Sequence, residues 1–280
     1  MKVTLVRITE DPVMAIEEAA SVCYDSEPSP NGRIMNDCYE SRHHSVLEFV
    51  QFHFLIEDVS RALLAQLTRH RMAGYAVRSQ RYVNESNSSA VAPPTIVDNE
   101  KAYELYADMI VKISECYDEL IDMGIPAEDA RYILPNGCCT KLHMTMNLRS
   151  LINFMNERLC KRAQEEIRSL ANCIKDIVLE NYSQIAEFLV PKCEIRKDYP
   201  FCTEKKSCGR HPRLKDVYRP EKHGWWEEIE DFDGESHWRC SVCKEEWWFE
   251  VGGPVENRIK YCPHCGAKLD LEENHHEQTT

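Results

Sequence analysis

The sequence predicts an α+β fold followed by a small cysteine-rich domain. Alternating apolar stretches, typical of half-buried strands, occur at unequal intervals rather than in regular strand–helix repeats. Other segments repeat apolar residues every three or four positions, as amphipathic helices do. After about residue 190 the long helical patterns stop, and Cys, Trp, Gly and Pro become frequent.

The predicted elements of the first domain mix separate strands with long helices. Residues 2–9 alternate like a strand, and residues 11–24 form a helix that Asp11 caps and Pro12 begins. A second strand is expected over residues 46–58. The remaining predicted elements are a helix carrying Leu63, Leu64 and Leu67 up to Arg69, a long helix over 98–124, a shorter helix from Pro126, a strand over 141–150, and one or two helices over 151–182.

Length and composition indicate one large domain and a smaller one. The chain has 280 residues, of which 43% are hydrophobic, so it can bury a substantial core. The predicted division is a catalytic domain over 1–190, a Cys-containing linker over 191–220, a ribbon over 221–271 and a polar tail over 272–280.

The charge balance excludes some classes of function. A formal net charge of −13 disfavours bulk nucleic-acid binding, which needs an extended cationic face. No apolar run is long enough for a membrane-spanning helix, and the N-terminus lacks the apolar core of a signal peptide. We therefore expect a cytoplasmic protein that binds neither nucleic acid nor membranes, and whose 14 cysteines are thiols or metal ligands rather than disulfides.

Two Cys-x-x-Cys pairs near the C-terminus predict a zinc ribbon. Cys240 and Cys243 are followed, after 18 residues, by Cys262 and Cys265. Two such pairs place four thiolates around one tetrahedral ion, and the intervening segment is expected to form two strands joined by a Gly-Gly-Pro turn. Four thiolates leave no open coordination position, so the predicted zinc is structural rather than catalytic.

A second group of soft ligands has irregular spacing. Cys193, Cys202, Cys208 and His211 could bind a metal, but buried thiols explain them equally well from the sequence. This alternative stays open at the level of the sequence.

Arginines gather without acidic neighbours between residues 59 and 84. Arg61, Arg69, Arg71, Arg78 and Arg81 lie in this stretch, which contains no Asp or Glu. Guanidinium groups bind phosphate in a bidentate manner, so we expect an anionic ligand here, with the Ser79 hydroxyl as a further donor. The alternative is a basic surface stripe whose partners are acids elsewhere in the chain.

A second cationic group follows the predicted strand at 141–150. Its arginines are Arg149, Arg158, Arg162 and Arg168, and Asn147 and Asn153 accompany them. Salt bridges to Glu157, Glu165 or Glu166 are the competing explanation. The chain contains neither a GxGxxG nor a GxxxxGK[ST] motif, so side-chain cations would have to hold a bound nucleotide.

These stretches resemble the flavin-dependent thymidylate synthase family. Arg69-His70-Arg71, seven residues and then Ser79 match the family's signature. The other matching stretches, which follow in family order over about residues 1–190, are "HHSVLEF" (43–49), Gln66, "ARYILP" (130–135) and "NLRSLINFMNERLCKRAQEEIR" (147–168).

The resemblance implies the reductive methylation of dUMP to dTMP. It implies FAD as cofactor, NADPH as reductant, methylenetetrahydrofolate as carbon donor, and a homotetramer whose active sites are shared between subunits. The family needs no cysteine nucleophile, which agrees with the lack of a nucleophile–base pair in this sequence.

The resemblance also implies roles for individual residues. Residues implied to act in catalysis are Ser79, Arg158 and His43, with Ser79 orienting the nucleotide. Residues implied to bind dUMP are Gln66, Ser79, Arg81, Arg131 and Arg158. Residues implied to bind the flavin are Ser45, Arg69, His70, Arg71, Asn147, Arg149 and Asn153, with His43 and Ser45 on the flavin and folate side.

The sequence departs from the family pattern at four positions. Gly74, Ala76 and Val77 stand where polar residues are usual, and Phe49 stands where histidine is usual. These departures leave two alternatives. One is a related transferase that places another one-carbon unit, such as hydroxymethyl, on a deoxypyrimidine monophosphate. The other is an inactive scaffold whose zinc ribbon binds a partner.

Overall fold

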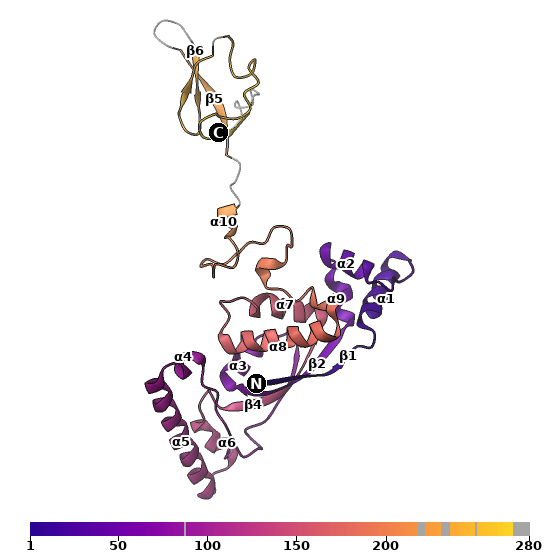
Figure 1. Cartoon of the computed structure of the whole chain (residues 1–280), viewed down its shortest axis with the longest axis vertical. Helices are drawn as coiled ribbons and strands as arrows, with labels where there is room; N and C mark the ends of the chain where they lie inside the picture. Colours follow the sequence, from indigo (N-terminus) through magenta and orange to yellow (C-terminus); the bar gives the residue numbers. More distant parts are fainter. Residues whose placement is uncertain (87, 218–221, 231–235, 250, 271–280) are drawn as a thin grey trace, which may run out of the picture. The chain divides into compact units, whose positions relative to one another are not determined.

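The computed structural model describes residues 1–86, 88–217, 222–230, 236–249 and 251–270 (Figure 1). The chain forms two compact units, Met1–Arg213 and Leu214–Thr280. Residues 191–213, which the sequence assigned to a linker, therefore belong to the first unit. Their side chains explain this, because Lys192 pairs with Glu157 and Arg162 donates to the Lys206 carbonyl at 2.8 Å. The tail predicted over 272–280 lies outside the described residues.

A four-stranded antiparallel sheet forms the centre of the first unit. Its order is β1 (Lys2–Ile8), β2 (Gln51–Ser60), β4 (Cys139–Asn147) and β3 (Gly74–Val77). On β2, buried Phe52, Phe54 and Ile56 alternate with residues that are more exposed. This alternation confirms that one face of the strand packs on a core.

The start of the second predicted strand is wrong. Residues His44–Phe49 form a 3-10 helix, η1, and the strand begins at Gln51. Val46 and Leu47 are both buried, and consecutive residues of a strand point to opposite faces. A helical turn can bury both, so it replaces the strand at this point.

Two helices supply most of the apolar cover of the sheet. The segment predicted as one or two helices contains α7 (Leu148–Arg158) and α8 (Glu165–Asn181). Helix α7 begins three residues before the predicted start, because the Asn147 side chain accepts from the Ser150 backbone N–H at 2.8 Å and caps it. Helix α8 packs against β1, α3 (Arg61–Leu67) and α7. Its buried residues Leu170, Ile174 and Val178 join the core with the inner face of β2.

The other helices surround this centre (Figure 1). The long helix predicted over 98–124 is confirmed as α5 (Glu100–Asp122), which Asn99 caps. The remaining helical elements of the first unit are α1 (Pro12–Tyr24), α2 (Arg33–Glu40), α3 (Arg61–Leu67), α4 (Pro94–Val97), α6 (Ala127–Ala130), η2 (Arg131–Ile133), α9 (Ser183–Ala186) and η3 (Lys192–Glu194). None of the described helices has the length and apolar character needed to cross a membrane.

The described part of the second unit contains one short helix and a small sheet. The helix is α10 (Leu214–Val217), and the strands, in sheet order, are β7 (Glu246–Trp247), β6 (Ser236–Cys240), β5 (His223–Glu230) and β8 (Lys268–Asp270). The prediction of two strands between the cysteine pairs is wrong for the described residues: only β7 lies there, and residues 251–258 form bends and turns.

Candidate active site

The loop that follows α3 carries the Arg-His-Arg sequence. Ser60 caps α3 by accepting from the Leu63 N–H at 2.9 Å, and half-buried Gln66 lies in the last turn of the helix. The Tyr75 hydroxyl lies 2.9 Å from both the Leu67 and the His70 carbonyl oxygens. A side chain of β3 thus closes the loop onto the end of α3.

His70 joins this loop to the first turn of α7. Its Nε2 lies 2.7 Å from the Ser150 Oγ, and the Ser150 hydroxyl donates to the Met72 carbonyl. Because the serine proton is already donated, His70 donates from Nε2, and its Nδ1 carries the lone pair. The ring edge also packs on Phe154, with 5.7 Å between ring centroids. Burial lowers the pKa of His70, and nearby Arg158 lowers it further, so the neutral imidazole is favoured.

Arg158 lies beside the same group at the C-terminal end of α7. Its charge acts on both His70 and Tyr75. Burial raises the pKa of Tyr75 to about 12, and Arg158 opposes that shift. Within the described residues Arg158 has no carboxylate partner, and Glu157, one of the competing partners considered above, pairs with Lys192 instead. The structure therefore keeps an uncompensated, half-buried cation next to the Arg-His-Arg loop.

Arg81 and Arg131 both contact Glu128, and Ser79 contacts Arg81. Arg81 Nε lies 2.5 Å from the Glu128 carboxylate, and Arg131 Nε donates to the Glu128 carbonyl at 2.9 Å. The Ser79 hydroxyl accepts from the Arg81 backbone N–H at 3.2 Å. Arg81 therefore has an acidic partner elsewhere in the chain, as the alternative of a basic surface stripe predicts. Three residues implied to bind the nucleotide nevertheless lie in one place.

Two further arginines lie behind this group. Arg61 Nη2 donates to the Arg78 carbonyl at 3.1 Å, and Arg78 pairs with buried Glu85 at 3.2 Å. Burial lowers the pKa of Arg61, and the charges of Arg131 and Arg78 contribute to this shift. Arg61 Nε is a buried donor without a partner among the described residues. We call Arg61, Arg78, Arg81 and Arg131 the arginine cluster.

The family resemblance implied no role for Arg61 in binding dUMP or the flavin. The only signal was its place at the start of the acid-free stretch, and that stretch does not show which arginines meet in space. The four arginines of the cluster face two carboxylates, Glu85 and Glu128. The cluster therefore has an excess of positive charge, which suits a phosphate dianion.

The residues implied to bind the flavin lie around the start of α7. Asn147 caps the helix, as described, while Arg149 and Asn153 are exposed on it one turn apart. Arg149 Nη1 lies 2.6 Å from the Glu48 carboxylate of η1, the short helix that also carries Ser45. Arg149 therefore has an acidic partner, but this partner is none of the three glutamates considered from the sequence.

The remaining flavin-side residues have fewer contacts. Arg69 and Arg71 are exposed and have no ion pair among the described residues. In the same described ranges, no hydrogen bond or ion pair joins Ser45 to Ser79, Arg81 or Arg131. His43 lines a pocket of about 280 Å³ next to α2, together with Arg33, Asp37 and Ser41.

The apolar residues in the middle of the signature have a structural cause. Gly74, Ala76 and Val77 form β3, the edge strand that pairs with β4. A Cβ at Gly74 would lie 2.8 Å from the Thr145 methyl group, so the facing strand demands glycine. Val77 packs against the core, whereas Phe49, at the end of η1, is 64% exposed.

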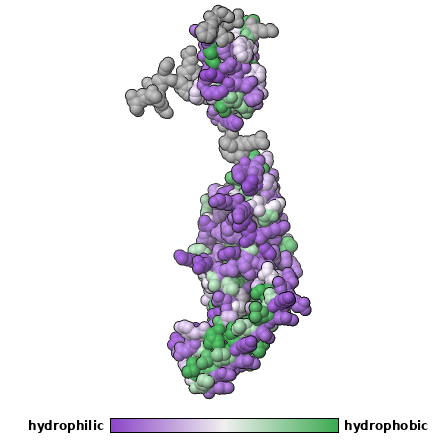
Figure 2. All heavy atoms as spheres, turned by 90° about the vertical axis from the view of Figure 1, so that its left-hand side faces the viewer, coloured by the Kyte–Doolittle hydropathy of each residue, from purple (hydrophilic) through white to green (hydrophobic). Residues whose placement is uncertain are grey.

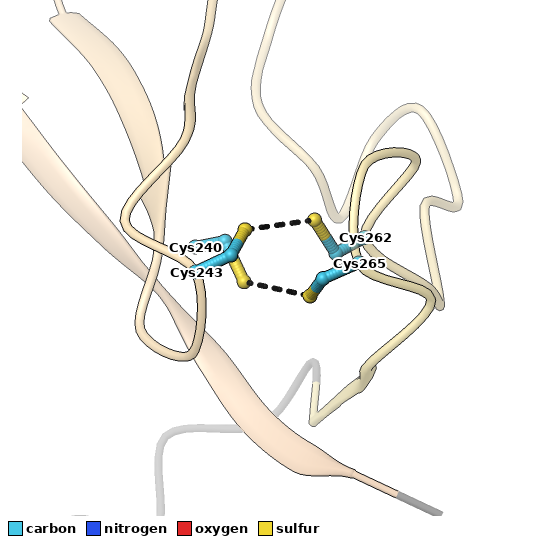
Figure 3. Close-up of side chains that lie close together, drawn as sticks. All are labelled: Cys240, Cys243, Cys262 and Cys265. Atoms are coloured by element: carbon cyan, nitrogen blue, oxygen red, sulfur yellow. Dashed lines mark hydrogen bonds between the residues drawn. The ribbon is translucent and has the colours of Figure 1, made fainter.

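The four cysteines of the second unit converge (Figure 3). The Cys240 and Cys265 sulfurs lie 3.9 Å apart, and those of Cys243 and Cys262 lie 3.7 Å apart. Metal–sulfur bonds of about 2.3 Å in a tetrahedron place sulfurs about 3.8 Å apart. Both Cys-x-x-Cys pairs turn tightly, with Lys244 at φ 63° and Gly266 at φ 69°. The donor set and its spacing therefore fit a tetrahedral four-thiolate metal site.

Comparison with known proteins supports the same family throughout the first unit. A family model described as thymidylate synthase complementing protein (Thy1) matches residues 4–182. The flavin-dependent thymidylate synthase of Geobacter sulfurreducens is 40% identical over 183 residues, which cover 61% of this chain and 79% of that protein. The flavin-dependent thymidylate synthase of Clostridium tetani is 33% identical over 246 residues, which cover 78% of this chain and 97% of that protein.

A solved structure agrees with these sequence matches. The Helicobacter pylori flavin-dependent thymidylate synthase, complexed with FAD and dUMP, has a TM-score of 0.56 and 27% identity to this chain. The match covers 68% of this chain and 100% of that chain. Since the family model spans more than half of the sequence, the chain belongs to the flavin-dependent thymidylate synthase family.

Proposed function

We propose that this chain converts dUMP to dTMP, with FAD as cofactor, methylenetetrahydrofolate as carbon donor and NADPH as reductant. Family membership over residues 4–182, a range that includes Arg69, His70, Arg71 and Ser79, carries the proposal. The similar Helicobacter pylori enzyme, complexed with FAD and dUMP, supports both ligands.

The arginine cluster would hold the dUMP phosphate. Arg81 and Arg131 supply forked donors, the Ser79 hydroxyl supplies a third, and Arg61 behind them adds positive charge. Gln66 would contact the nucleotide from α3. Arg158 would lie near the uracil oxygens, where a fixed cation stabilises negative charge that develops on the ring during carbon transfer.

The start of α7 and the Arg-His-Arg loop would hold FAD. Arg69 and Arg71 are exposed cations without acidic partners in the described residues, which suits the pyrophosphate. Asn147, Arg149, Asn153 and Ser45 would complete the binding surface, and neutral His70 would keep the loop in place through Ser150. When bound, the flavin supplies the hydride that reduces the transferred carbon. His43, beside its pocket, would serve the folate side.

Binding of dUMP and of deoxyuridine separates the phosphate role from a folding defect. Arg131→Ala removes one charge-assisted contact, which contributes about 1.5–3 kcal/mol. We expect a 10- to 150-fold loss of dUMP affinity, as each ~1.4 kcal/mol is tenfold, and unchanged affinity for deoxyuridine, which lacks the phosphate. Arg7→Ala, an exposed arginine of β1, is the matched control. Equal losses for both ligands would contradict the assignment.

Product analysis tests the reaction itself. The full chain, given FAD, NADPH, methylenetetrahydrofolate and dUMP, should form dTMP and bleach the flavin absorbance. A product heavier by one oxygen atom would indicate hydroxymethyl transfer, and a protein that binds neither FAD nor dUMP would indicate an inactive scaffold.

We further propose a homotetramer, on the basis of the apolar surface of α5. Figure 2 shows apolar side chains gathered over the end of the first unit that carries this helix. Leu105 is 70% exposed, and Met109, one turn further along the same face of the helix, is about half exposed. Such contiguous apolar surface is typical of subunit interfaces. Light scattering should show a tetramer, and Leu105→Glu should shift it toward smaller species, whereas Glu104→Gln, next to it and also exposed, should not.

We also propose that Cys240, Cys243, Cys262 and Cys265 hold a structural zinc ion. The sulfur–sulfur distances fit, and four thiolates leave no position for substrate or water. Among the described residues of this unit, the buried core cluster consists of two of these cysteines, Ala267 and Leu269. Metal binding would therefore supply much of its folding free energy.

A further inference from the structure

A second set of soft metal ligands lies in the first unit, after α9. Cys193, Cys202, Cys208 and His211 are separated by eight, five and two residues. All four residues line one cavity of about 10 Å³, which holds a single water-sized or ion-sized body. Cys193 and Cys202 are buried, at 9% and 7% exposure.

His211 lies close to Cys193 and Glu194. Donor atoms of Cys193, Glu194 and His211 all lie within 4.8 Å of one another. The Glu194 carboxylate is 3.2 Å from His211 Nε2. Metal-binding histidines usually donate their second ring nitrogen to a carboxylate, which fixes the ring and frees the other nitrogen for the ion. Glu194 therefore suits the role of orienting His211, whose Nδ1 would face the metal.

Backbone contacts hold Cys202 and the turn that carries Cys208 next to His211. The Cys202 N–H donates to the Pro212 carbonyl at 2.7 Å, next to His211, and Cys202 pairs with Arg213 in a β-bridge. Between Cys208 and His211 the chain turns at Gly209, with φ 86°. The Ser207 hydroxyl stabilises this turn by donating to the His211 carbonyl at 3.2 Å.

The segment needs a source of stability other than regular structure. Over residues 191–213 the described elements are only the single turn η3 and one β-bridge. A metal ion supplies folding free energy where a short segment cannot bury enough apolar surface. A thiolate–imidazole set favours zinc, which takes Cys₃His in tetrahedral structural sites.

We propose that Cys193, Cys202, Cys208 and His211 bind a structural zinc ion that is separate from the four-cysteine cluster of the second unit. Cys160, which follows α7, also lines the cavity. Cys160 lies outside the proposed ligand set because, unlike Cys202 and Cys208, it does not belong to the segment that holds His211. The ion would hold residues 191–213 next to the end of α7, where Arg158 lies.

The test measures zinc in the full chain with the second unit's cluster disabled. Cys240→Ser/Cys262→Ser serves as the background, and zinc is counted by mass spectrometry after dialysis against a chelator. We expect about one zinc ion per chain in this background. Adding Cys202→Ser or His211→Ala should remove it. Adding Cys160→Ser, or Cys116→Ser at an exposed site on α5, should leave it in place.

A rescue variant separates metal loss from misfolding. His211→Cys completes four thiolates, so it should keep the ion that His211→Ala loses. Cobalt substituted for zinc should show the visible bands of tetrahedral coordination, changed in His211→Cys because a sulfur replaces a nitrogen. Far-ultraviolet circular dichroism follows the folding of each variant.

Three results would overturn the proposal. One is a background protein that retains its helices but contains no zinc. Another is loss of zinc on Cys160→Ser while Cys202→Ser retains it. The third is a disulfide between Cys193 and Cys202 in the purified chain, shown by two fewer reactive thiols under denaturing conditions.

Discussion

Ser150→Ala tests the contact that joins the Arg-His-Arg loop to α7. The hydroxyl of Ser150, a residue that is 3% exposed, bonds both His70 Nε2 and the Met72 carbonyl. Alanine removes both bonds and leaves the Asn147 cap of the helix intact. The change therefore loosens the loop. It does not lower the helix propensity of the first turn of α7.

The expected cost follows from the number of bonds lost. Each hydrogen bond makes a net contribution of about 0.5–1.5 kcal/mol to the free energy of unfolding, so the loss of two bonds should lower it by about 1–3 kcal/mol. With a urea slope of about 3 kcal/mol/M, the midpoint of the first unit should fall by about 0.3–1 M. Because the loop would bind FAD, the affinity for FAD should fall as well.

The two units can be followed separately in one experiment. All five tryptophans lie between residues 225 and 248, so tryptophan fluorescence reports on the second unit. Every described helix longer than four residues lies in the first unit, so far-ultraviolet circular dichroism reports on that unit. Measurements at one protein concentration remove the effect of assembly on the midpoint.

Ser169→Ala on α8 is the matched control. Its hydroxyl bonds Glu165 on the same helix at 2.6 Å, and loss of this contact should change stability by no more than about 0.5 kcal/mol. If Ser150→Ala unfolds at the same urea concentration as Ser169→Ala and binds FAD as tightly as the parent, the reasoning about His70 is wrong.

Three further predictions concern the edge strand, the pH dependence and the second unit. Gly74→Val should cost about 1–3 kcal/mol, because its Cβ would collide with the facing threonine methyl, while Ala76→Val on the same strand should be tolerated in urea unfolding. The lowered pKa of His70 means that the unfolded chain binds its proton more readily, so stability should decline as pH falls below the ordinary value of about 6.5, and His70→Gln should reduce this decline. Chelation of the metal, or the Cys240→Ser/Cys262→Ser variant, should unfold the second unit, which tryptophan fluorescence would detect. The circular dichroism of the first unit should stay unchanged. Loss of both signals would contradict independent folding of the two units.

Local patterns predicted much of the fold. The long helix over 98–124 is clear from its apolar spacing, and the alternation of β2 is clear beyond residue 51, because both patterns depend on neighbours within one element. The boundaries of the helices and strands were less predictable. Val46 and Leu47 look like part of a strand, yet burial of both requires a helical turn, and that burial depends on what packs around them.

For the site, the sequence by itself determined the chemistry. It identified the family motifs, the acid-free run of arginines and the two Cys-x-x-Cys pairs, because residue type and spacing along the chain carry that information. It also showed the soft ligands after residue 190 without showing whether they meet.

Only the tertiary structure decided which groups pair. The strands and helices bring Glu48 to Arg149 and Glu128 to Arg81, so these two arginines are compensated by acids that are distant along the chain. The tertiary structure also places Arg61 in the arginine cluster and brings His211 to Cys193. These contacts join residues that are distant along the chain, and their free energy depends on distance and burial, which sequence spacing does not encode.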